Sequence, residues 1–147
     1  MTLYIGAIAD DFTGATDLAS MLTRGGLATV LQLGAPDPAD ACPDADAIVV
    51  ALKSRTAPVD EALYETLRSW RWMAAAGARQ CYFKYCSTFD STADGNIGPV
   101  AEALMTATGA SQTIYTPALP ENGRTIYQGK LFVGDALLSE SGMQNHP

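Results

Sequence analysis

Two adjacent carboxylates, Asp10 and Asp11, directly follow an apolar segment at residues 3–9. Such a pair can bind Mg²⁺ or accept the proton of a substrate hydroxyl group. Two carboxylates in a buried corner repel each other, so a cation or a hydrogen-bond donor is needed beside them. The alternative is structural, because either aspartate can cap the following helix and favour its dipole. The residue types leave both interpretations open.

Basic side chains follow a second apolar segment, at residues 47–52, where Lys53 and Arg55 flank Ser54. Arginine can hold a carboxylate or a phosphate with two parallel hydrogen bonds. The alternative is a solvated pair of surface cations. Arg124 ends a stiff loop rich in proline and glycine, and we expect it to face the same crevice as a further cation.

Lys84 lies inside a third apolar segment, where an unpaired lysine is costly to bury. It therefore either emerges at the edge of a sheet or serves a site. Short polar side chains that suit a polyhydroxylated ligand follow it, although turns and helix caps use the same residue types. They include Ser87, Thr88, Asp90 and Ser91. Gly95, Asn96 and Gly98 then open a helix whose exposed amides can hold an anion, which alone is a weak signal.

Five apolar segments, each short enough for one strand, alternate with amphipathic stretches. The predicted strands are residues 3–9, 27–33, 47–52, 81–85 and 112–116. Helical spacing predicts a helix capped by Thr13, a second opened by Pro58, and a third from Ile97 to Gly109. This order predicts one α/β domain over residues 1–147, with a doubly wound, mostly parallel, Rossmann-like sheet of about five strands. The carboxyl ends of such strands share one edge, where ligands bind.

The tail has a different pattern. Residues 124–127 and 130–133 flank Gln128-Gly129, which predicts a small C-terminal β-hairpin appended to the sheet.

Composition limits the class of protein. The chain has 147 residues, 48% hydrophobic and 17% charged, with a net charge of −7. The negative charge disfavours nucleic acid and anionic membranes as partners. No apolar run approaches the ~20 residues of a membrane span, and no signal peptide is recognisable. Three cysteines without a C-x-x-C pair are typical of reduced thiols in a cytoplasmic protein. The single histidine, His146, argues against a histidine-rich metal site, and we assign no metal ligands.

Several known site patterns do not fit. Receiver domains need a phosphate-accepting aspartate at the end of the third strand, where this chain has Leu52-Lys53. Haloacid-dehalogenase-type phosphatases need Asp-x-Asp after the first strand, but here the two acids are adjacent. The P-loop pattern and the dinucleotide pattern G-x-G-x-x-G after the first strand are both absent.

The same loops carry long, unusual strings that resemble the four-carbon acid sugar kinases. The strings are IADDFTGATD at 8–17, KSRT at 53–56, FKYCSTFDSTADGNIGPV at 83–100, PALPENGRTIYQGKLFV at 117–133 and LLSESGMQNHP at 137–147. The resemblance implies ATP-dependent phosphorylation of the terminal hydroxyl group of a four-carbon acid sugar such as 3-dehydrotetronate. It also implies two parts in the whole protein, an N-terminal part that binds the sugar acid and a C-terminal part that binds ATP and Mg²⁺.

Under that resemblance, the residues singled out above take provisional roles. Asp10 or Asp11 would orient the attacking hydroxyl group and accept its proton. The basic residues of the second loop, with Ser54 and Arg124, would clamp the substrate carboxylate. Lys84 and the short polar residues up to Ser91 would bind the sugar hydroxyls and the oxo group. The helix start at Gly95, Asn96 and Gly98 would approach the transferred phosphate.

This chain resembles only the sugar-binding part, so we expect it to be inactive as a kinase by itself. Its expected partners are a small sugar acid and a C-terminal kinase domain. Apolar surface left for that domain would also allow self-association. A non-catalytic sugar-acid-binding or regulatory module is the alternative function.

Overall fold

The computed structural model describes residues 3–89 and 91–145, and it confirms the α/β class. A four-stranded parallel sheet forms the body of the molecule. Its strands are β1 (Ile5–Ala9), β2 (Thr29–Leu33), β3 (Ala47–Ala51) and β4 (Gln80–Lys84). Three helices connect or follow them: α1 (Phe12–Arg24), α2 (Val59–Ala75) and α3 (Ile97–Thr108).

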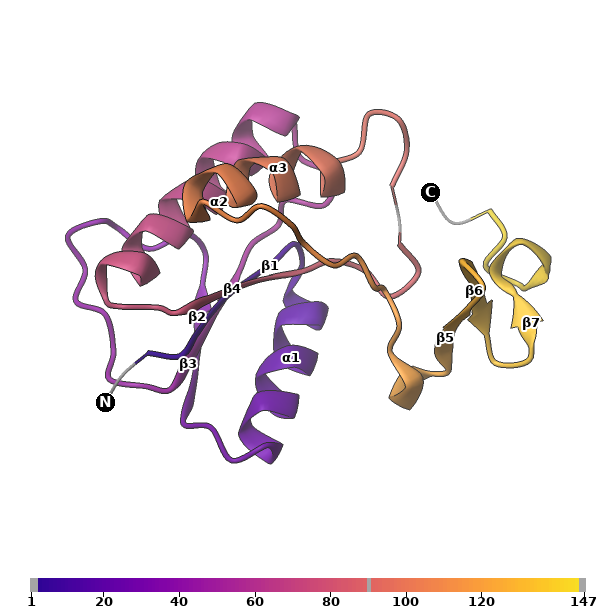
Figure 1. The fold of residues 1–147 in the computed structure, drawn as a ribbon, viewed down its shortest axis with the longest axis horizontal. Coiled ribbons are helices and arrows are strands. Elements are labelled where there is room, and N and C mark those ends of the chain that lie inside the picture. The colour runs from indigo at the N-terminus through magenta and orange to yellow at the C-terminus, as the bar shows by residue number, and fades with distance from the viewer. Residues whose placement is uncertain (1–2, 90, 146–147) are drawn as a thin grey trace.

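The sheet is doubly wound, with strand order β2-β3-β1-β4. In Figure 1, α1 covers one face of the sheet, and α2 and α3 cover the other. Each face has its own core, because β3 is buried at every position and sends alternate side chains to the two sides. Ile48 and Val50 pack in the larger core with the α2 and α3 side chains, whereas Val49 packs in the smaller core under α1. Because all four strands are parallel, their carboxyl ends lie at the same edge of the sheet.

The first helix begins two residues earlier than we predicted. Its cap is Asp11 and not Thr13, because the Asp11 backbone is extended (φ −147°, ψ 165°) and its side chain accepts a bond from the Gly14 amide. The Thr13 side chain is instead exposed inside the first turn. The structural role considered for the aspartate pair is thus present at Asp11.

The prediction of a strand at residues 112–116 is wrong for this chain. These residues form no strand, and Ile114 is 86% exposed. The segment pairs with no strand, and its Thr116 amide donates to the Tyr85 hydroxyl at 2.8 Å. Strand propensity alone does not make a strand, because it depends on the neighbours that a segment finds in the fold.

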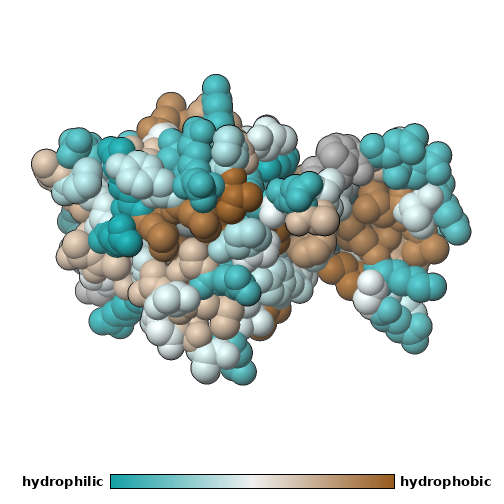
Figure 2. All heavy atoms as spheres, turned by 90° about the horizontal axis from the view of Figure 1, so that it is seen from above, coloured by the Kyte–Doolittle hydropathy of each residue, from teal (hydrophilic) through white to brown (hydrophobic). Residues whose placement is uncertain are grey.

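The predicted hairpin is confirmed, but it belongs to a sheet of its own. β5 (Arg124–Tyr127), β6 (Lys130–Val133) and β7 (Ala136–Leu137) form an antiparallel sheet in the order β5-β6-β7. Gln128 and Gly129, at φ 49° and 74°, make the two-residue turn. No residue of these three strands is buried. We call residues 119–145, which contain this sheet, the C-terminal lobe. Figure 2 shows apolar surface gathered on the C-terminal lobe, at the right of the view.

Within the described ranges, no helix has both the length and the apolar character that a membrane span requires.

Candidate functional site

Backbone hydrogen bonds join the ends of β1, β3 and β4 into one rigid rim. The Asp10 amide donates to the Lys84 carbonyl at 3.0 Å, and the Asp10 carbonyl accepts from the amides of Ser54 and Arg55 at 3.0 and 3.2 Å. Side chains from three loops are thereby fixed relative to one another. A site on such joined strand ends is well ordered before a ligand arrives, which lowers the cost of binding.

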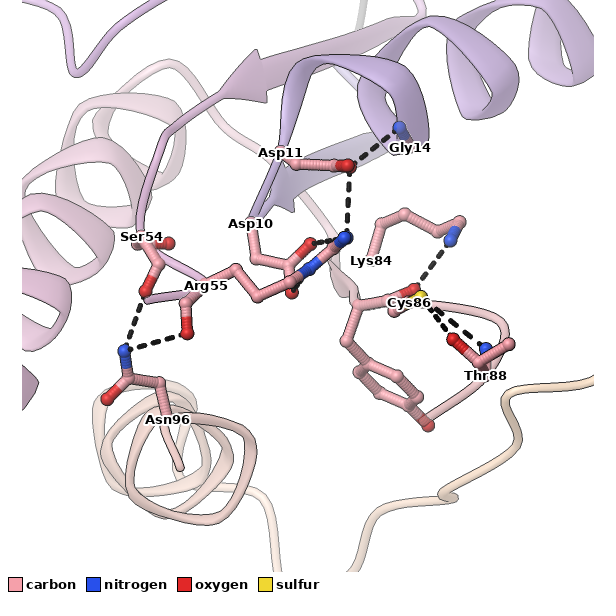
Figure 3. Close-up of polar contacts among 10 residues, drawn as sticks. Asp10, Asp11, Gly14, Ser54, Arg55, Lys84, Cys86, Thr88 and Asn96 are labelled. Atoms are coloured by element: carbon pink, nitrogen blue, oxygen red, sulfur yellow. Dashed lines mark hydrogen bonds and ion pairs between the residues drawn. The ribbon is translucent and has the colours of Figure 1, made fainter. Parts of the chain in front are cut away.

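A bidentate ion pair lies at the centre of the rim. The Arg55 Nε and Nη2 groups donate to the two carboxylate oxygens of Asp10 at 3.1 and 2.8 Å. Asp10 is only 4% exposed, whereas Arg55 is half-buried. Figure 3 shows the Arg55 guanidinium group extending toward both aspartates. The sequence required a cation beside the two carboxylates, and Arg55 is that cation.

Asp11 has two partners. Its Oδ1 accepts from the Gly14 amide at 2.7 Å and lies 3.1 Å from Arg55 Nη2. One oxygen therefore both caps α1 and completes the ion-pair cluster, which leaves Oδ2 without a hydrogen-bond partner among the described residues. Of the two aspartates, Asp11 is the less buried and the better placed to meet a substrate hydroxyl group.

Burial and charge oppose each other in this cluster. Burial raises the pKa of Asp10 above its usual 3.8, although the hydrogen bonds and the charge of Arg55 pull it down. Burial alone would lower the pKa of Arg55, but its hydrogen bonds to Asp10 and the charges of both aspartates outweigh burial and raise it. We infer that the pair is ionised at neutral pH, because two well-aligned charge-assisted bonds favour the ionised forms of both groups.

Two lysines approach the same rim. Lys84 donates from Nζ to the Tyr85 carbonyl at 2.6 Å, and its side chain passes beside Gly14. Lys53 is exposed and places Nζ over the Phe12 ring, 5.2 Å from its centre, at the start of α1. An ammonium group has three donors, so Lys84 can bind a ligand while it keeps its carbonyl contact.

The loop after β4 lies beside these cations. The Thr88 hydroxyl and the Cys86 thiol are 2.8 Å apart, and Thr88 is buried. Ser87 is half-buried and Ser91 is exposed. Asp90 lies outside the described residues.

Asn96 fixes the loop that carries Arg55. Its Nδ2 group donates to the carbonyls of Ser54, Arg55 and Ala57 at 2.6, 3.4 and 2.9 Å. These contacts give Asn96 a bracing role at the start of α3, as Figure 3 shows.

Replacing Asn96 by alanine should therefore lower the free energy of unfolding by about 1–3 kcal/mol, since the carbonyls of a buried loop lose their donor. Chemical denaturation of the two proteins measures the difference. Asn122→Ala, at an exposed position, is the control and should change stability little. Equal stability of the Asn96 variant and the parent would contradict the bracing role.

Gly14 is where α1 passes closest to the ion-pair cluster. A Cβ atom at this position would lie 2.7 Å from Asp11 Oδ1 and 3.5 Å from Lys84 Nζ. The absence of a side chain here thus allows the cap and the lysine to approach together.

Gly14→Ala should displace the Asp11 carboxylate and weaken binding of a sugar acid, even though alanine favours a helix by about 1 kcal/mol over glycine. Calorimetric titration before and after the change measures the loss. Thr16→Ala on the exposed side of the same helix should bind as the parent does. If Gly14→Ala binds unchanged, the position of the Asp11 carboxylate is unimportant.

The remaining predicted site residues are Gly95, Gly98 and Arg124, and none of them contacts the Asp10–Arg55 pair. Gly95 packs under the preceding turn, because an added Cβ atom would come within 2.2 Å of Ser91 Oγ. Gly98 is exposed with open space around it. Arg124 opens β5 and donates to the Asn122 carbonyl and to Met143 Sδ, and both of these partners lie in the C-terminal part of the chain.

The carboxylate oxygens of Asp10 and Asp11 are not arranged as ligands of a magnesium ion. Both Asp10 oxygens already accept bonds from Arg55, and Asp11 Oδ1 is shared between Gly14 and Arg55. Within residues 3–89 and 91–145, no cluster of three or more histidine, cysteine or acidic residues could hold a metal ion.

Sequence reasoning missed two features of the rim. Cys86, which the sequence marked only as one of three reduced thiols, lies in the loop after β4 and is one of the groups that raise the pKa of Arg55. Gly14 was not singled out, because a single sequence does not show which glycine backbone lies close to other side chains.

The chain matches a known protein family over nearly its whole length. The family model described as "Sugar-binding N-terminal domain" matches residues 5–147. A 3-oxo-tetronate kinase of Burkholderia multivorans is 63% identical over 143 residues, which cover 97% of this chain and 33% of the relative. The chain thus spans about a third of the length of the curated relatives it matches.

Two solved structures have the same fold. Haemophilus influenzae protein HI1011 is 58% identical, with a TM-score of 0.91 over 97% of this chain and 34% of its own. A Bordetella bronchiseptica protein of the DUF1537 family is 32% identical, with a TM-score of 0.83 over 100% of this chain and 37% of its own. That second protein is a domain-swapped dimer with bound citrate.

Proposed function

Because this chain belongs to the family of sugar-binding N-terminal domains, we propose that it binds the sugar acid for an ATP-dependent kinase. The substrate is a four-carbon acid sugar such as 3-dehydrotetronate, and the whole protein transfers phosphate to its 4-hydroxyl group. The similarity to 3-oxo-tetronate kinases, at 52–63% identity, supports this substrate class.

The observation that carries the proposal is the rim where Asp10, Asp11, Arg55 and Lys84 meet. A sugar acid presents a carboxylate and several hydroxyl groups, and the rim offers ammonium donors beside carboxylate acceptors. Lys84, with Lys53 at the margin, binds the substrate carboxylate. Asp11 accepts a hydrogen bond from the reacting hydroxyl group and takes its proton.

The structure shifts the proposed role of Arg55. Its Nε and Nη2 donors are occupied by the aspartates, which leaves Nη1 to reach a ligand. Arg55 therefore acts mainly by holding Asp10 and Asp11 in place. Citrate, bound by the Bordetella protein, is also a hydroxylated carboxylate, in keeping with a site for hydroxy acids.

Ser54, Ser87, Thr88, Asp90 and Ser91 are proposed to contact the hydroxyl and oxo groups. Arg124 is proposed to join them when the C-terminal lobe approaches the rim. The helix start at Gly95, Asn96 and Gly98 is proposed to face the transferred phosphate.

ATP and Mg²⁺ are proposed to bind mainly to a C-terminal kinase domain, in the cytoplasm. Phosphoryl transfer depends on positioning and on charge stabilisation around the metal-bound nucleotide, so we expect no kinase activity from residues 1–147 alone. The exposed apolar face of the β5-β6-β7 sheet is the proposed contact for that domain or for a second copy.

Isothermal titration calorimetry of the 147-residue chain with 3-dehydrotetronate tests the proposal. We expect saturable binding, with citrate competing weakly and a neutral four-carbon sugar not competing. Absence of heat with the sugar acid, in a chain shown to be folded, would refute the proposed function.

The alternative is a sugar-acid sensor without a catalytic role. It is favoured only if binding occurs and the chain mixed with a kinase C-terminal half from a relative gives no phosphorylated product.

A further inference from the structure

β4 is an edge strand whose outer side is open. The Gln80 amide and the Lys84 carbonyl both bond to the side of β1, at 2.9 and 3.0 Å. Backbone groups of alternate residues point the same way, so those of Cys81 and Phe83 point away from the sheet. The four-stranded sheet supplies no strand on that side. Native proteins usually cover or protect such edges, and β4 contains no proline.

Residues 112–116 lie beyond this edge and do not pair with it. Paired strands lie about 4.8 Å apart. Between the backbones at Tyr85 and Thr116, however, stands the full Tyr85 side chain plus a hydrogen bond of 2.8 Å. The tyrosine rings at 85 and 115 have their centres 6.4 Å apart. Residues 112–116 thus do not pair with β4, and the two segments line a common gap.

The gap is an apolar groove of about 900 Å³. It crosses the sheet edge, so helices from both faces contribute to its walls. The large apolar side chains among its lining are Leu18, Met21, Trp70, Leu104, Met105 and Ile114. Open backbone groups on one wall and apolar side chains on both faces suit a strand, because a strand alone satisfies the backbone and places side chains on both faces.

We propose that this groove receives one extended, apolar β-strand from a polypeptide segment outside residues 1–147, inserted between β4 and residues 112–116. The curated relatives are about three times as long as the part that this chain matches, and their unmatched two thirds are the source we assign. The insertion turns β4 into a central strand and brings residues 112–116 into the sheet. The predicted fifth strand then forms as the outer neighbour of the inserted one.

Overlapping synthetic peptides that span the unmatched part of the Burkholderia multivorans relative test this proposal. Each is added to the ¹⁵N-labelled chain, and amide hydrogen exchange is followed by NMR. We expect one apolar peptide to slow exchange at Cys81 and Phe83 by ~10-fold or more. The Tyr82 amide, which faces β1, is the internal reference. The same peptide with alternate N-methylated amides should lose the effect.

Three results would overturn the proposal. In the first, no peptide protects these amides. In the second, the amides are protected without peptide in proportion to protein concentration, which indicates a second copy. In the third, they are protected without peptide at every protein concentration, which indicates that residues 112–116 close onto β4 themselves. The Asp10–Arg55 pair does not line the groove although Lys84 does, so the sugar-acid titration is run without peptide and its outcome is judged separately.

Discussion

Replacing Arg55 by methionine should lower the free energy of unfolding at pH 7 by about 3 kcal/mol, since removal of one partner leaves a buried charge uncompensated. Asp10 is 4% exposed and loses both of its charge-assisted bonds. Methionine keeps much of the length of the arginine side chain, so lost packing contributes little. Urea denaturation at several pH values measures the effect.

The pH dependence identifies the cause. Burial already raises the pKa of Asp10, and loss of the opposing arginine raises it further. A carboxyl group whose pKa is higher in the folded state contributes stability below its unfolded pKa and loses that contribution as pH rises through the folded pKa. The destabilisation should therefore be smallest near pH 4 and grow toward pH 7.

The double variant Arg55→Met with Asp10→Asn is the matched control. It removes the buried charge together with its partner and should recover part of the lost stability at pH 7. Destabilisation that is independent of pH, with no recovery in the double variant, would show that the ion pair is not what holds the rim.

Replacing Lys84 by methionine should weaken binding of 3-dehydrotetronate by ~10- to 100-fold, which corresponds to one hydrogen bond to a charged group. Lys84 lies beside Gly14 and keeps donors in addition to its bond to the Tyr85 carbonyl. Calorimetric titration gives the dissociation constant, and circular dichroism checks that the variant is folded.

Lys130→Met, an exposed lysine of the C-terminal lobe, removes the same charge away from the rim and should bind as the parent does. Equal weakening by both changes would mean that only net charge matters. In that case Lys84 is not a direct contact of the substrate carboxylate.

The fold could be predicted in outline because buried parallel strands leave a clear pattern. β3 is apolar throughout and is buried at all five positions. Glycine ends the helices where the chain turns, as at Gly109, whose φ is 70°. The failure at residues 112–116 has a different origin, because strand propensity depends on a partner strand, and these residues pair with none.

The site was predictable as a location and not as a set of contacts. Strand topology brings Asp10, Arg55 and Lys84 to one rim, which residue types and the parallel sheet already indicated. Pairing within the rim depends on side-chain geometry that one sequence does not contain. Asn96 illustrates this, because nothing in the sequence indicated that its side chain donates to three carbonyls of the loop after β3.

The most direct test of a sugar-acid site at the rim is an NMR titration of the ¹⁵N-labelled chain with 3-dehydrotetronate. We predict saturable shifts centred on the amides of Asp11, Gly14, Arg55 and Lys84, with those of the β5-β6-β7 sheet unchanged. Shifts confined to residues remote from the three strand ends, or none at saturating ligand, would contradict the account.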